Sequence, residues 1–276
     1  MRRTVLAILA LAALAAAAPP ARALAGQVLD FTVSGDTATA ELSLPVGLGA
    51  DLSVSFEQVS NLDQQSLGLS VQSVSLLDLL GRLPQGVTLA TAFPLLLRIT
   101  PPADGALSFQ GVATVDLHTT NLLYVVGTPL RLFKAEDGGS FHDVTVSMGS
   151  GSYRVRGTTG GFSEFLILVD LRPTATVIGA KYDRLQQLLD ADRTSVPSAV
   201  ADALASELQA SLAAYQVGDL IGARGQLEQL AATVVAHSGT DIPDVWSAAR
   251  DRVDMAGDLR AAASTLELSL ALAAGS

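Results

Sequence analysis

The sequence contains no cysteine among its 276 residues, so disulfides, thiolate nucleophiles, iron–sulfur clusters and cysteine-based zinc sites are excluded. Aromatic residues make up only 5 % of the chain and charged residues 16 %, against 49 % apolar residues. This composition excludes a disordered protein and suffices for a hydrophobic core. Bases are scarcer than acids, 17 against 27, and the resulting charge of −10 repels phosphate backbones. We therefore expect no nucleic-acid partner.

The first 25 residues have the pattern of a secretory signal peptide. Two arginines at positions 2 and 3 precede an almost purely aliphatic run over 5–18, which is too short to span a hydrocarbon core of ~30 Å comfortably. Small-x-small sites predict cleavage after Ala23 or Ala25. A retained N-terminal anchor and a twin-arginine signal are the alternatives, although the fuller twin-arginine motif is missing. Cleavage removes three bases and no acid, so the mature net charge is −13.

The rest of the chain predicts an exported protein without a membrane span. No later stretch offers ~20 uncharged apolar residues. An exported protein without cysteine must be stable through packing alone, which is typical of bacterial envelopes. We therefore expect export through the inner membrane, to the periplasm or the medium.

Residues 26–176 show the alternation of apolar and polar residues that is typical of strands. It is clear over 28–33, 38–44 and 52–56, and clusters of Gly, Pro, Asp and Ser separate such runs. Residues 76–83 break the alternation and predict a helical turn. Short strands at regular spacing predict an antiparallel β-sandwich.

The end of this region predicts a meander of antiparallel strands. Runs over 130–133, 141–148 and 153–156 are separated by glycine-rich turns, with a shift in phase between Phe141 and Val144. The run 162–169 is apolar on both faces near its end, as expected for a central strand. Its Phe-Ser-x-Phe start resembles the closing strand of immunoglobulin-like sandwiches in exported bacterial proteins, and the resemblance implies the fold alone.

After Pro173 the apolar residues recur with the period of a helix. The stripes predict four helices with short loops, which pack as an up-and-down bundle over residues 177–276. Asp219 is the expected cap of the third helix, and Thr240 or Asp241 the start of the fourth, which carries Trp246. The predicted fold class is thus α+β as two segregated domains, an antiparallel β-sandwich followed by a helical bundle. The leucines over 266–272 fit neither pattern.

The segment from Ala203 to Leu259 resembles the FIMAH-type helical domain of bacterial extracellular proteins. The Gly-Asp between two helices and the Gly-x-x-Ile-Pro entry to the last helix are its more specific parts. The matching residues are Ala214, Tyr215, Gly218, Asp219, Ala223, Leu227, Leu230, Ala236, Gly239 and Ile242. The resemblance implies a non-catalytic accessory module, and the whole chain resembles an exported bacterial protein.

The sequence contains no catalytic motif. Its three histidines, His118, His142 and His237, form none of the close pairs typical of metal sites, and His237 suits a helix C-terminus. The Gly-Ser-Gly at 149–151 lies between strands, whereas a nucleophile elbow joins a strand to a helix. Residues 157–161 lack the Gly-Lys-Ser/Thr ending of a phosphate loop. We therefore expect neither catalytic residues nor a cofactor.

Acidic residues near one predicted hairpin are the candidate metal ligands. Ca²⁺ takes six to eight oxygen ligands, and Asp116, Glu136, Asp137 and Asp143 supply carboxylates. No Asp-x-Asp-x-Asp-Gly loop is present, and a solvated acidic turn is the alternative. If these residues and His142 converged in one pocket, they would define a site that their linear order does not.

Three functions fit these observations. The favoured one is a non-enzymatic protein whose sandwich binds a protein or glycan at the envelope or outside the cell, with the helices as an accessory module. The first alternative is an extracellular hydrolase whose carboxylates converge only in the fold. The second is an assembly role in which sheet edges pair between copies.

Overall fold

The computed structural model describes residues 24–275 except Val46, Asp137 and Asp192. The predicted signal peptide therefore lies outside the described residues, apart from Leu24 and Ala25, and so does the candidate ligand Asp137. None of the helices in this described part is long and apolar enough to cross a membrane.

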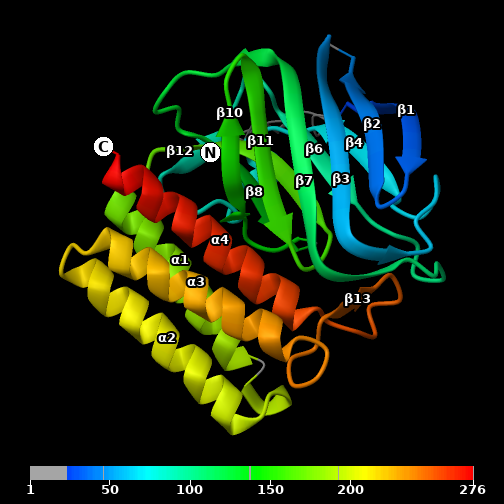
Figure 1. The fold of residues 1–276 in the computed structure, drawn as a ribbon. Coiled ribbons are helices and arrows are strands. Elements are labelled where there is room, and N and C mark those ends of the chain that lie inside the picture. Colours follow the sequence, from blue (N-terminus) through cyan, green and yellow to red (C-terminus); the bar gives the residue numbers. More distant parts are fainter. Residues whose placement is uncertain (1–23, 46, 137, 192, 276) are drawn as a thin grey trace, which may run out of the picture.

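Two antiparallel sheets face each other in the first part of the chain (Figure 1). The larger has the order β1-β2-β3-β7-β11-β10, with β13 also paired to β7. Its strands are β1 (Gln27–Ser34), β2 (Thr37–Leu44), β3 (Leu48–Ser60), β7 (Ser108–Leu123), β10 (Thr145–Gly149), β11 (Ser152–Thr159) and β13 (Val245–Ser247).

The smaller sheet has the order β4-β6-β12-β8-β9, and β5 also pairs with β12. Its strands are β4 (Leu69–Ser73), β5 (Val87–Leu89), β6 (Leu95–Ile99), β8 (Leu130–Ala135), β9 (His142–Asp143) and β12 (Glu164–Asp170). The predicted helical turn is the short 3-10 helix η1 (Leu77–Leu79). The predicted phase shift after Phe141 corresponds to the break between β9 and β10.

The hydrophobic core forms because every second side chain of the larger sheet points at the smaller one. Leu52 and Leu117, for example, pack into the same cluster as Phe165 and Ile167 of β12. The other face of β12 is also buried, because its leucines pack with Phe133 in a second cluster. This confirms the prediction that the strand is central and apolar on both faces.

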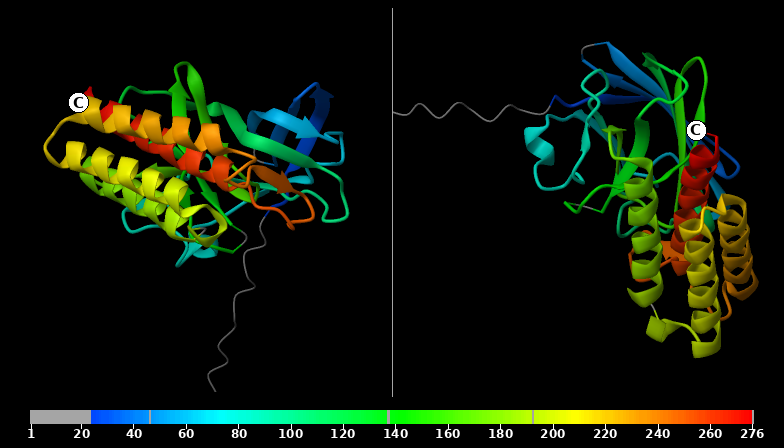
Figure 2. Two further views of the ribbon diagram at one scale, coloured as in Figure 1. Left: turned by 60° about the horizontal axis from the view of Figure 1, so that its bottom comes forward. Right: turned by 90° about the vertical axis from the view of Figure 1, so that its left-hand side faces the viewer.

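Four helices follow the sheets, which confirms the predicted fold class. They are α1 (Thr174–Ala191), α2 (Ser198–Gln216), α3 (Leu220–His237) and α4 (Met255–Ala274), with the 3-10 turn η2 (Arg193–Ser195) after α1. Each helix contacts the next along the chain, and α4 also contacts α1. Figure 2 shows them gathered beside the sheets. The change of period lies where predicted, since α1 begins directly after Pro173 and residues 174–176 are already helical.

Asp219 is the N-cap of α3, as predicted, and its Oδ1 accepts a hydrogen bond from the Gly222 N–H at 2.8 Å. The preceding Gly218 has a φ of +84°, a left-handed conformation that ends α2 and that glycine adopts without strain.

The predicted start of the fourth helix at Thr240 or Asp241 is wrong. Residues around Trp246 form β13 and a loop, and α4 begins at Met255, where the Asp254 carboxylate accepts from the Gly257 N–H at 2.7 Å. Trp246 leaves the helical pattern because its ring stacks on that of Phe109, 5.3 Å away, in the core of the sheets. The leucines over 266–272 belong to α4, and Leu266 and Leu270 are buried in the helical core.

The helices contact the sheets along α4, which lies across β7, β10 and β11 (Figure 1). Arg260 of α4 pairs with Glu57 of β3 through two nitrogen–oxygen contacts of 2.7 Å. Gly160 permits the close approach, because a Cβ there would lie 2.5 Å from the Asp258 nitrogen. The fold therefore brings α1 and α4 against one end of the sheets.

Candidate functional site

A cavity of about 220 Å³ lies between the smaller sheet, β11 and the helices α1 and α4. At ~30 Å³ per water molecule, it has room for roughly seven waters. Much of its wall is apolar. The apolar lining residues are Pro84, Phe141, Val144, Ala180, Leu188, Ala261 and Ala262.

The polar part of the wall is rich in cations. The lining includes the cationic residues Lys134, Arg172, Lys181 and Arg184, the acids Asp143 and Asp258, and the neutral polar residues His142, Thr158, Thr159 and Thr265. These side chains come from β8, β9, β11, α1, α4 and the segment after β12. The site is therefore made by packing of the helices on the sheets.

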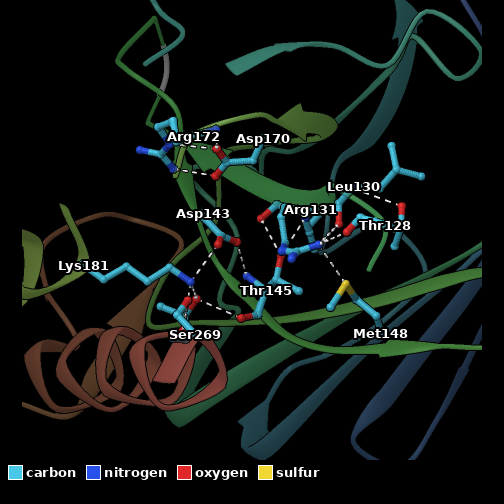
Figure 3. Close-up of polar contacts among 12 residues, drawn as sticks. Thr128, Leu130, Arg131, Asp143, Thr145, Met148, Asp170, Arg172, Lys181 and Ser269 are labelled. Atoms are coloured by element: carbon cyan, nitrogen blue, oxygen red, sulfur yellow. Dashed lines mark hydrogen bonds and ion pairs between the residues drawn. The ribbon is translucent and has the colours of Figure 1, made fainter. Parts of the chain in front are cut away.

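A buried ion pair joins the helices to the sheets at one wall of this cavity (Figure 3). Lys181 Nζ lies 2.7 Å from Asp143 Oδ2 and also donates to Thr265 Oγ1 at 2.7 Å. The Thr265 hydroxyl in turn donates to the Thr145 carbonyl at 2.8 Å. Burial opposes ionisation of Asp143, but Lys181 and the Thr145 N–H hold its pKa below the usual range. The pair therefore fixes α1 and α4 to β9 and β10.

A second polar cluster lies beside the pair (Figure 3). Arg172 holds Asp170 in a two-pronged contact of 2.8 and 2.7 Å. Arg131 Nη1 donates to the carbonyls of Thr128 and Leu130, at 2.7 Å each. Both arginines are thus engaged by oxygen atoms of the chain, which indicates a structural role, and of the two only Arg172 lines the cavity.

Two further cations of the cavity wall, Lys134 and Arg184, are less well satisfied. Lys134 is buried and pairs at 2.9 Å with Glu136, whose side chain is 66 % exposed. Arg184 is half-buried, and no described residue gives it a hydrogen bond or an ion pair within 4 Å. The buried Thr158 Oγ1 likewise finds no hydrogen-bond partner among the described residues.

The pKa values of two neighbours reflect burial and these cations. Burial, reinforced by Lys134 and Arg184, lowers the pKa of His142 to about 3, so the imidazole is neutral at physiological pH. Burial raises the pKa of Asp258, whose carboxylate accepts from the Gly160 N–H at 3.1 Å. The four charged or titratable groups therefore interact at one end of the cavity.

The three predicted metal ligands that the structure describes, Asp116, Glu136 and Asp143, are each held by a different cation. Asp116 lies on the outer face of the larger sheet and pairs with Arg156 at 2.8 Å, whereas Glu136 pairs with Lys134 and Asp143 with Lys181. Of these residues, only Asp143 lines the cavity. Within residues 24–275 as described, no group of three or more His, Asp or Glu side chains is placed to hold a metal ion.

The three histidines are separated. His118 lies 3.4 Å from Asp51 on the outer face of the larger sheet, and His237 ends α3 with its Nδ1 2.6 Å from Asp241. His142 alone lines the cavity. Sequence reasoning did not identify Lys181, Arg184 or Asp258, which lie on helices far from the hairpin where the candidates were sought.

The fold and the cavity define a class: a two-sheet β-sandwich with a helical layer docked on it and a cavity of about 220 Å³ between them. The chain belongs to the DUF6689 family, a family of unknown function, whose model matches residues 8–274. No match is found among curated proteins. The family match covers the sheets and the helices together, and the resemblance of the helices to FIMAH-type domains stays a prediction.

Proposed function

We propose that this protein is an exported, non-enzymatic binding protein of the bacterial envelope or its surroundings, and that its ligand occupies the cavity between the sheets and α1 and α4. The observation that carries the proposal is the cavity itself. It combines apolar walls with polar groups, among them the Arg184 guanidinium, which makes no hydrogen bond with a described residue. This combination is typical of small-molecule sites.

The hydrogen bonds around the cavity favour binding over hydrolysis. A nucleophilic hydroxyl needs a base within hydrogen-bond reach. The Thr265 hydroxyl donates to a backbone carbonyl, and Thr159 does the same toward Gly161. Among the described lining residues, no hydroxyl is bonded to a histidine or carboxylate. Asp143, the candidate carboxylate that lines the cavity, is neutralised by Lys181.

Export predicts a processed N-terminus. Leu24 donates its N–H to Ser73 Oγ at 3.0 Å and accepts from the Ser73 N–H at 2.9 Å. Cleavage after Ala23 keeps both bonds, whereas cleavage after Ala25 removes them. We therefore expect the exported protein to begin at Leu24 when its N-terminus is sequenced from the periplasm or the medium. Recovery of the chain only inside the cell, still beginning at Met1, would contradict export.

The binding proposal predicts a co-purifying small molecule. Native mass spectrometry of the protein isolated from its producing cells should show an added mass that denaturation releases. Ala262→Leu, which extends a side chain into the cavity, should reduce the occupied fraction at least about tenfold, as expected when a ligand's space is filled. Ala210→Leu is the matched control, because Ala210 is exposed on α2 and does not line the cavity.

Two outcomes would contradict the proposal. One is an empty wild-type protein. The other is an added mass that Ala262→Leu retains as fully as Ala210→Leu does. Hydrolysis of a substrate by the purified protein, abolished by a change at Asp143 or Asp258, would favour the hydrolase alternative.

A further inference from the structure

We infer that the ligand of this cavity is a small organic anion, with one acidic head group and a short apolar body. The inference rests on the proposed function and adds the chemical class of the ligand. Its basis is the composition of the wall, in which Lys134 and Arg184 keep hydrogen-bonding capacity and seven apolar residues present aliphatic and aromatic carbons.

Arg184 and Lys134 are the groups that would hold the head. The Arg184 guanidinium, half-buried on α1, makes no hydrogen bond or ion pair with the described residues. Lys134 is buried, and its ion-pair partner Glu136 lies out in solvent. A guanidinium presents a planar fork that matches a carboxylate or phosphate with two parallel hydrogen bonds. A bound anion would satisfy both cations.

The local field at this end favours a negative group. Lys134 and Arg184 both act on His142, opposing its protonation, and both favour the ionised form of Asp258. His142 is consequently neutral and adds no charge of its own. Asp258 receives the Gly160 N–H, so one of its oxygens is already engaged. A cationic ligand would instead meet Lys134 and Arg184, whereas the acids of the wall are already engaged, Asp143 by Lys181 and Asp258 by the Gly160 N–H.

The remaining wall sets the size and polarity of the body. Phe141, Leu188 and Ala262 present carbon atoms to the cavity. Room for roughly seven water-sized groups corresponds to a chain of about six carbons with its head group.

Four compounds with the same six-carbon chain and different head groups test this inference. Hexanoate, hexyl phosphate, hexanol and hexylamine are titrated by calorimetry into the protein that begins at Leu24. We expect hexanoate or hexyl phosphate to bind ten- to a hundredfold more tightly than hexanol, as charge-assisted hydrogen bonds imply, and hexylamine to bind most weakly. Whichever anion binds more tightly identifies the head as a carboxylate or a phosphate ester.

Variants of Arg184 test whether this residue causes the preference for anionic ligands. Arg184→Gln should weaken anion binding about tenfold or more and leave hexanol unchanged, and Arg184→Lys should restore part of the loss. Arg252→Gln is the control, because Arg252 is exposed and does not line this cavity. Circular dichroism of each variant verifies the fold.

The results separate this inference from the function on which it rests. Equal binding of hexanol and the anions, lost in Ala262→Leu, would overturn the anionic class and leave the cavity as a ligand site. Anion binding that Arg184→Gln does not weaken would overturn the assignment of the head. If none of the four compounds bound, the inference would be overturned. The proposed function is tested separately, by the co-purified mass in native mass spectrometry.

Discussion

Lys181→Met is expected to lower the free energy of unfolding by about 3–5 kcal/mol, because it leaves a buried carboxylate without its cation. The Asp143 side chain is only 3 % exposed and the Lys181 side chain 7 %, so water cannot replace the lost partner. The methionine keeps most of the volume of the lysine stem, which limits the effect of packing. Urea unfolding followed by circular dichroism measures the change.

Two further variants show that the loss comes from the unpaired charge. Arg193→Met removes an exposed ion pair with Asp202 and should cost no more than about 1 kcal/mol. Adding Asp143→Leu to Lys181→Met should recover part of the stability, because both buried charges are then gone. A Lys181→Met protein within about 1 kcal/mol of the wild type would contradict the structural role of the pair.

The ion pair of Lys181 and Asp143 also makes the free energy of unfolding of the wild type depend on pH. The pKa of Asp143 is lower in the folded protein than in the unfolded chain, because Lys181 and Thr145 outweigh the cost of burial. The stabilisation by ionised Asp143 is therefore complete above the pKa of the carboxyl in the unfolded chain, about 4. It is lost as the pH falls through the lower pKa of Asp143 in the folded protein. The difference between the wild type and Lys181→Met should accordingly be large at pH 7 and shrink in acid.

Phe109→Ala is expected to cost a further large amount of stability, about 3–5 kcal/mol, by opening a cavity in the core of the sheets. Phe109 is 1 % exposed, and its ring lies 5.3 Å from Phe56, 5.4 Å from Phe162 and 5.3 Å from Trp246. Each aromatic pair adds about 0.5–1.5 kcal/mol beyond the buried area. The loss should appear as a lower urea midpoint.

Trp246 provides a direct signal for the same variant, because it is the only tryptophan of the chain. Losing the stacked Phe109 ring should shift its fluorescence to longer wavelength as water reaches the indole. Val253→Ala is the control, since Val253 is 59 % exposed on the loop before α4. Unchanged emission from the folded Phe109→Ala protein would show that β13 is not held by this stack.

The fold was predictable from the sequence wherever one local pattern determined the structure. The alternation over 38–44 is typical of a half-buried strand, and β2 buries every second residue there. Gly218 and Asp219 marked the junction of α2 and α3. The pattern misled at 245–254, where apolar residues happen to recur at helical spacing ahead of α4. There the contact of Trp246 with Phe109, far earlier in the chain, determines the local structure.

The site was less predictable, because its residues meet only through packing of distant elements. The sequence search favoured acids close together in the chain, yet Asp143 is neutralised by Lys181 of α1. One local sign was present: Lys181 lies on the face of α1 that also carries the buried Ile178 and Leu185. A cation inside an apolar stripe indicates a buried partner. Arg184 offered no comparable sign.

The most direct test of the account is a crystal structure of the protein that begins at Leu24, grown with the tightest-binding anion of the hexyl series. The account predicts the ligand in the cavity between β9, β11, α1 and α4, with its acidic head at the Arg184 guanidinium and its chain against Phe141 and Ala262. An empty cavity with the ligand bound elsewhere, or a ligand seated with its head away from Arg184 and Lys134, would contradict it.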